Sequence, residues 1–165
     1  MKRLHLDEVW WLVSPQNPLK PGDGMAPFAI RLAAARATAK SPRIRVLDLE
    51  ARLGTRYTFD TVTAICRHFP RTRFVWLMGA DNLKQIRHWR RWREIFRRLP
   101  IAVLDRPTYS LAALSDLAAQ AFARHRVQPG AARSLAELAP PAWAFLTIKL
   151  DPHSASAIRE KNSGR

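Results

Sequence analysis

The sequence has few of the residues from which disulfide and metal sites are built. Cys66 is its one cysteine among 165 residues, and none of the five histidines forms a metal-spaced cluster with it. A disulfide framework and a Cys/His metal site are therefore excluded. Cys66 belongs to an apolar pattern of helical spacing, so we expect a small core residue there.

Long apolar runs are also absent. No apolar stretch approaches the roughly 20 residues that a membrane-spanning helix needs. The chain starts with the basic residues Lys2 and Arg3, but Asp7 and Glu8 interrupt the apolar run that would follow in a signal peptide. This pattern is not that of a signal peptide, so we expect a soluble, cytoplasmic protein without a membrane partner. The length suits one domain over residues 1–165, and the sequence leaves a homo-oligomer open.

Acidic residues are scarce. There are 13 Asp and Glu against 28 Lys and Arg, which gives a formal net charge of +15. A basic domain suggests phosphate-bearing partners, either nucleic acid or anionic small molecules, although base composition of the genome explains an arginine-rich chain equally well. Arginines interleave with apolar residues over 89–99. Their heads are more commonly solvated along a helix than docked on nucleic acid, so we do not expect a nucleic-acid partner.

Short apolar runs of strand length alternate with segments of helical periodicity. The runs predict strands at 9–13, 44–49, 74–78, 101–104 and 143–148. The periodic segments predict helices within 25–40, 57–69, 89–99 and 111–124 and from residue 154, with loops at 50–56 and 126–141. The alternating pattern of 44–49 places it near a sheet edge. The order of elements predicts an α/β fold with a doubly wound parallel sheet.

Candidate site residues follow these strands. Gly79 and Asp81 come after the strand at 74–78, in a predicted loop. At the carboxyl end of a parallel strand a glycine lets backbone approach a ligand, and an acid can face ligand hydroxyls. Taken alone, the pattern is more typical of a plain turn in which Asp81 or Asn82 only caps the next helix. Lys20, Arg106 and the segment 154–159 follow other strands and would meet at the same edge.

Five motifs in one order resemble those of bacterial nicotinate-nucleotide adenylyltransferases. The resemblance covers residues 4 to about 161. The motifs are Pro18-Leu19-Lys20, Tyr57-Thr58-x-Asp60-Thr61, Gly79-Ala80-Asp81-Asn82-Leu83 with Trp89 eight residues past Asp81, Arg106-Pro107, and Ser154-x-Ser156-x-Ile158-Arg159.

The resemblance implies a Rossmann-like nucleotidyltransferase that joins ATP to nicotinate mononucleotide, giving deamido-NAD and pyrophosphate, with Mg²⁺ bound together with ATP. For ATP, it implies ribose contacts from Gly79 and Asp81 and phosphate contacts from Ser154, Ser156 and Arg159 at a helix N-terminus. For the mononucleotide, it implies that Tyr57 and Thr58 hold the nicotinate end, that Trp89 stacks on the ring, and that Lys20 and Arg106 face phosphate.

The chain departs from the family pattern in three places. Leu19 stands where the family often has His, and Ser154-Ala155-Ser156 stands where it has Ser-Ser-Thr. The family's first strand, with its glycine-rich turn and H-x-G-H motif, is missing. In the family those histidines bind the triphosphate and stabilise transition-state charge, so we predict no catalytic residue in this chain. By analogy with oxyanion donors, the loss costs roughly 10² to 10³ in rate per group.

Two alternative functions stay open at this point. One is an adenylyltransferase with another acceptor, such as pantetheine phosphate, against which Tyr57, Thr58 and Trp89 argue. The other is a basic, non-enzymatic nucleic-acid-binding domain built on the arginine-rich helix.

The missing strand generates the first testable prediction. In this family a strand lies between those predicted at 9–13 and 74–78, so two apolar edges are left open. We expect the 165-residue chain alone to be poorly soluble and without measurable adenylyl transfer. We further expect the reading frame, continued upstream for about 25 residues, to encode a strand, a glycine-rich turn and H-x-G-H. An in-frame stop codon immediately upstream, or an active 165-residue protein, would contradict this.

Overall fold

The computed structural model describes residues 1–15, 25–105 and 110–148. The strands are β1 Val9–Leu12, β2 Ile44–Leu47, β3 Trp76–Gly79, β4 Ile101–Leu104, β5 Arg126–Val127 and β6 Trp143–Leu146. The α-helices are α1 Phe28–Thr38, α2 Leu49–Leu53, α3 Thr58–His68, α4 Ala80–Gln85, α5 Trp92–Arg98, α6 Ser110–Leu114 and α7 Leu117–Ala121. Four 3₁₀ helices complete the described chain: η1 Lys2–Leu4, η2 Ile86–His88, η3 Ala123–His125 and η4 Pro129–Glu137.

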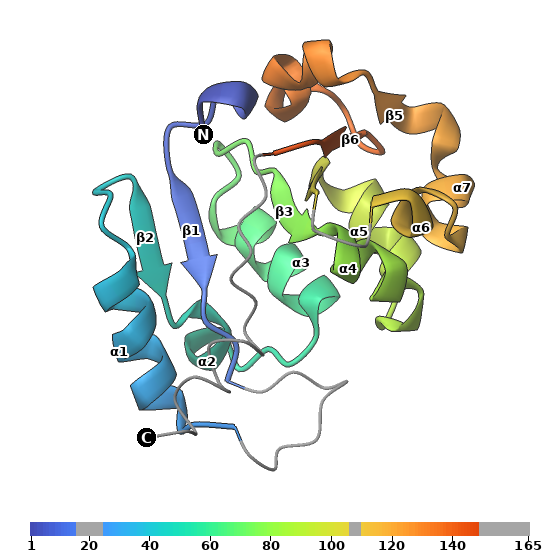
Figure 1. The fold of residues 1–165 in the computed structure, drawn as a ribbon. Coiled ribbons are helices and arrows are strands. Elements are labelled where there is room, and N and C mark those ends of the chain that lie inside the picture. The colour runs from blue at the N-terminus through green and yellow to red at the C-terminus, as the bar shows by residue number, and fades with distance from the viewer. Residues whose placement is uncertain (16–24, 106–109, 149–165) are drawn as a thin grey trace, which may run out of the picture.

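The strands form two parallel sheets. One pairs β1 with β2, and the other has the order β3-β4-β6-β5. Figure 1 shows the two sheets on opposite sides of α3, with α1 beside β2 and with α6 and α7 at the far end of the larger sheet. The predicted parallel α/β architecture is confirmed, as is the position of β2 at an edge, since within the described chain it pairs with β1 alone.

Both faces of the four-stranded sheet are buried. Because successive side chains of a strand point to opposite faces, Ile101 and Val103 join one apolar cluster, while Ala102 joins another. The first cluster contains buried residues of α4, α5 and α7, and the second contains buried residues of η1 and η4. The sheet is therefore covered from both sides, as the doubly wound fold requires.

A groove of about 900 Å³ separates the two sheets. Its walls include β1 and the residues from Arg71 to Leu77, and Val62 and Ile65 of α3 also line it. Within the described residues, β1 is paired with β2 and β3 with β4, and neither strand has a partner on the groove side. The predicted pair of open strand edges is thus present.

Arg31 of α1 holds the end of the strand β1. Its guanidinium donates hydrogen bonds to the carbonyl oxygens of Ser14 (2.7 Å), Pro15 (2.5 Å) and Ala26 (2.9 Å). These carbonyls stand on both sides of the segment 16–24, which contains Lys20 and lies outside the described residues. One side chain therefore connects the exit of β1 to the start of α1.

Several predicted boundaries are wrong because short elements leave weak patterns. The predicted loop 50–56 overlaps α2, a five-residue helix that ends at the left-handed Gly54. The predicted loop 126–141 contains β5 and η4, and η4 begins at Pro129, where a missing N–H costs nothing. The predicted helix 111–124 is divided among α6, α7 and η3, because Asp116 adopts an extended backbone.

Two further boundary predictions are wrong at helix starts. The predicted helix 25–40 begins at Phe28, after Pro27. The predicted helix 57–69 begins one residue later, at Thr58, because its N-cap Tyr57 has an extended backbone.

Cys66 is half-buried rather than enclosed in the core. Burial raises the pKa of its thiol above the ordinary value, and the positive charge of Arg98 opposes this shift. No helix in the described part of the chain combines the length and apolar character needed to cross a membrane.

The core position of Trp92 yields a stability test. Trp92 is 7% exposed and contacts Phe96 and Phe122 edge-on, at centroid distances of 6.2 and 6.0 Å. We expect Trp92→Ala to lower the free energy of unfolding by about 3 kcal/mol in urea titrations, because it leaves a cavity. Trp11→Ala is the matched control, since Trp11 is 41% exposed. Equal losses for both variants would contradict the assignment.

Candidate functional site

The carboxyl ends of β3 and β4 lie side by side, because Gly79 is in register with Leu104. Gly79 is both the last residue of β3 and the N-cap of α4, with φ −78° and ψ 160°. Asp81 lies in the first turn of α4 and is partly buried. The predicted loop after β3 is therefore wrong: the strand passes directly into a helix, which places an acidic side chain at the helix start.

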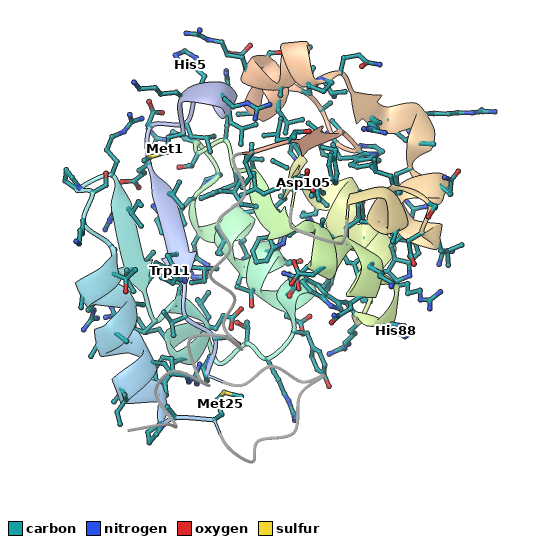
Figure 2. The ribbon with its side chains drawn as sticks, in the orientation of Figure 1. Met1, His5, Trp11, Met25, His88 and Asp105 are labelled. Atoms are coloured by element: carbon teal, nitrogen blue, oxygen red, sulfur yellow. The ribbon has the colours of Figure 1, made fainter. Side chains whose placement is uncertain are left out.

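Asp105 is a second acid at this sheet edge. It follows β4, is 7% exposed, and donates its backbone N–H to the carbonyl oxygen of Leu146 at 2.9 Å. Figure 2 shows Asp105 in the interior of the molecule and His88 at its periphery. Sequence reasoning missed Asp105, since only burial distinguishes it from an ordinary acid at a strand end.

Tyr57 and Thr58 begin α3. Tyr57 is extended, with φ −111° and ψ 141°, and its carbonyl oxygen accepts hydrogen bonds from the N–H groups of Asp60 (2.9 Å) and Thr61 (3.1 Å). Thr58 is the first residue of the helix. Both side chains are half-buried at the surface, so a ligand can reach them.

A buried polar group supports this helix start. The Thr61 hydroxyl is fully buried and lies 2.8 Å from the Thr55 hydroxyl and 3.5 Å from Glu50 Oε1. The Glu50 carbonyl also accepts a 3.0 Å hydrogen bond from the Thr55 N–H. These bonds join α2 to the segment before Tyr57. Sequence reasoning missed Glu50 because it lay in a predicted loop.

Trp89 follows η2 with an extended backbone, φ −79° and ψ 142°. Its N–H donates to the Ile86 carbonyl at 2.8 Å, and its partly buried side chain packs against the larger apolar cluster. The next residue, Arg90, lies over the Tyr57 ring, with its guanidinium carbon 5.1 Å from the ring centroid. The structure thus brings the segment of Trp89 against that of Tyr57, two segments for which the family resemblance implies contacts with one ligand.

The charge around these segments is mainly positive. Asp60 forms an ion pair with one of the positive groups, Arg90. Exposed basic side chains come from the start of α3 and from the α4–η2–α5 region. They are Arg56, Lys84, Arg87, His88, Arg90 and Arg91. A surface of this kind attracts anionic ligands such as nucleotides.

Five predicted site residues, Lys20, Arg106, Ser154, Ser156 and Arg159, lie outside the described residues. Across the described part of the chain, no three His, Cys, Asp or Glu side chains group as a metal site. A Mg²⁺ ion that arrives with ATP takes most of its ligands from phosphate and water and needs one or two carboxylates. Such an ion therefore needs no preformed cluster of protein ligands, because most of its ligands come with the nucleotide itself.

Three curated proteins similar to this chain are each described as a probable nicotinate-nucleotide adenylyltransferase. The protein from Parvibaculum lavamentivorans is 53% identical over 161 residues, which are 98% of this chain and 80% of the relative. The protein from Cereibacter sphaeroides is 52% identical over 159 residues, 96% of this chain and 84% of the relative. The protein from Gluconobacter oxydans is 47% identical over 165 residues, all of this chain and 85% of the relative.

A solved structure shows the same fold. Nicotinic acid mononucleotide adenylyltransferase from Plasmodium falciparum, complexed with NaAD, superposes with a TM-score of 0.66 at 16% identity, covering 94% of this chain and 69% of that chain. A second structure of that protein, complexed with APC, gives a TM-score of 0.64. Residues 1–161 also match the cytidylyltransferase-like family. The chain is therefore a member of that nucleotidyltransferase family and, within it, of the nicotinate-nucleotide adenylyltransferases.

Proposed function

We propose that this chain binds ATP and nicotinate mononucleotide for the transfer of AMP to the mononucleotide, which forms deamido-NAD and pyrophosphate. The contact of Arg90 with Tyr57 carries the proposal, because it joins the two segments expected to hold the pyridine ring. The sheet edge with Gly79 and Asp81 is continuous with the segment of Trp89 through α4 and η2. ATP and its acceptor would thus share one edge of the sheet.

The reaction needs alignment and charge stabilisation more than a covalent nucleophile. The phosphate oxygen of the mononucleotide attacks the α-phosphorus of ATP, a P–O bond forms, and the bond to the β-phosphate breaks as pyrophosphate leaves. Holding the two phosphates in line contributes most of what the protein supplies. Mg²⁺ bound with ATP would neutralise charge on the triphosphate.

The proposed roles within the described site are those that the family resemblance implies. Gly79 and Asp81 are proposed to contact the ribose of ATP, where the Asp81 carboxylate accepts hydrogen bonds from hydroxyls. Tyr57 and Thr58 are proposed to hold the nicotinate end and Trp89 to stack on the ring, since an aromatic face suits a flat heterocycle. Lys20, Arg106, Ser154, Ser156 and Arg159 are proposed as phosphate contacts on the resemblance of their motifs.

The chemical step lacks one set of groups in these 165 residues. None of the five histidines has a second histidine at the H-x-G-H spacing. Donors aimed at the developing charge are each worth roughly 10² to 10³ in rate. Ligand binding therefore tests the proposed site more directly than turnover does.

Isothermal titration with each ligand tests the proposal. We expect Trp89→Ala to weaken binding of nicotinate mononucleotide about tenfold, or roughly 1.4 kcal/mol, with ATP affinity unchanged. Asp81→Asn should weaken ATP and leave the mononucleotide unchanged. Trp11→Ala, on an exposed strand position, controls for loss of a tryptophan. Equal effects of Trp89→Ala on both ligands, or tighter binding of pantetheine phosphate or duplex DNA than of the mononucleotide, would overturn the assignment.

A further inference from the structure

Two consecutive arginines attach the turn after Trp89 to the first turn of α3. Arg90 Nη1 lies 3.3 Å from Asp60 Oδ2, and its guanidinium carbon lies 5.1 Å from the Tyr57 ring centroid. Arg91 places its guanidinium carbon 4.1 Å from the ring centroid of Phe59. The two arginines thus contact three side chains of α3 and its N-cap: the carboxylate of Asp60, the phenol ring of Tyr57 and the buried phenyl ring of Phe59.

The backbone of the turn has one residue in a disfavoured conformation. Arg91 has φ 53° and ψ 37°, in the left-handed region, which is disfavoured for residues other than glycine. Such a conformation persists where surrounding contacts hold it. The stacking of Arg91 on Phe59 is one such contact, and the Arg90–Asp60 ion pair is a second.

The placement of the pair links it to the proposed ligand site. Arg90 directly follows Trp89, and Asp60 lies two residues after Thr58. The ion pair therefore connects two residues that lie within two positions of residues proposed to hold the pyridine ring. Asp81 lies in α4 and takes no part in these contacts.

We propose that Asp60 and Arg90 are positioning residues that hold Trp89 beside Tyr57 and Thr58 and so set the affinity for the mononucleotide. This inference rests on the proposed function of the site. The side chains of the pair are 35% and 55% exposed, and an exposed ion pair contributes little to the stability of a fold. Its removal should therefore leave the protein folded and show its effect in ligand binding.

The direction of the effect separates positioning from simple electrostatics. Asp60→Asn removes a negative charge from a basic surface, so charge attraction alone would tighten binding of the anionic mononucleotide. Loss of the positioning contact predicts the opposite, a weakening of about tenfold, typical of coupled residues. Arg90→Gln should weaken binding to a similar extent.

Titration of nicotinate mononucleotide and ATP into the full chain and its variants tests the proposal. We expect Asp60→Asn, Arg90→Gln and the double variant to weaken the mononucleotide by similar factors, without additivity, and to leave ATP affinity unchanged. The charge swap Asp60→Arg with Arg90→Asp should recover a large part of the affinity. Glu94→Gln and Arg97→Gln are matched controls, because Glu94 and Arg97 form an ion pair within α5 whose side chains are similarly exposed, at 40% and 55%. These two variants should change neither affinity.

The possible failures are distinguishable. Unchanged or tighter mononucleotide binding by Asp60→Asn, while Trp89→Ala weakens it, would overturn the positioning role and leave the proposed function intact. No effect of Trp89→Ala would overturn the proposed function together with this inference. Equal weakening of ATP and the mononucleotide, or a lowered unfolding midpoint in Asp60→Asn, would show a general structural role instead.

Discussion

Burial of both faces of the four-stranded sheet is the constraint on which the other elements depend. Each of its strands β3, β4 and β6 alternates side chains between two apolar clusters, so helices are needed on both sides. The helices α4 and α5 cover one face, while η1 and η4 cover the other. Parallel pairing then brings all carboxyl ends to one edge, where Gly79 and Asp105 lie.

Helix α3 couples this sheet to the smaller one. Its buried residues Val62 and Ile65 line the groove between the sheets, and its N-terminal turn carries Tyr57, Thr58 and Asp60. The same helix therefore serves the packing of the fold along one side and the candidate site at one end. Glu50, Thr55 and Thr61 hold that end from within the protein.

Five of the six strands were predictable from sequence because each is a short apolar run with a definite end, whereas the two-residue β5, which begins with an arginine, lies in a predicted loop. The run 101–104 agrees with β4, whereas 44–49 is too long, since Asp48 already serves as the N-cap of α2. The grouping of Tyr57 with Trp89 followed from the resemblance of their motifs to the family. The contacts between the two segments could not be predicted, because Arg90 and Asp60 are 30 residues apart in the sequence. Helical spacing shows which residues share one face of a helix, but it does not show which other segment that face contacts. The left-handed Arg91 likewise leaves no compositional signal.

The groove also divides each bordering strand into two sides with different access to solvent. On the β2 side of β1, the N–H of Val9 donates to the Arg43 carbonyl at 2.8 Å and the N–H of Val13 to the Leu47 carbonyl at 3.0 Å. Because backbone N–H groups alternate in direction along a strand, those of Trp10 and Leu12 point toward the groove. In β3, Trp76 donates to the Pro100 carbonyl at 2.8 Å, which directs the N–H of Leu77 to the groove. Neighbouring amide hydrogens on one strand therefore differ in access to water, and those that face the groove should exchange with deuterium faster than those bonded within the sheet. Protection along β1 and β3 would alternate from residue to residue, although every residue belongs to a strand.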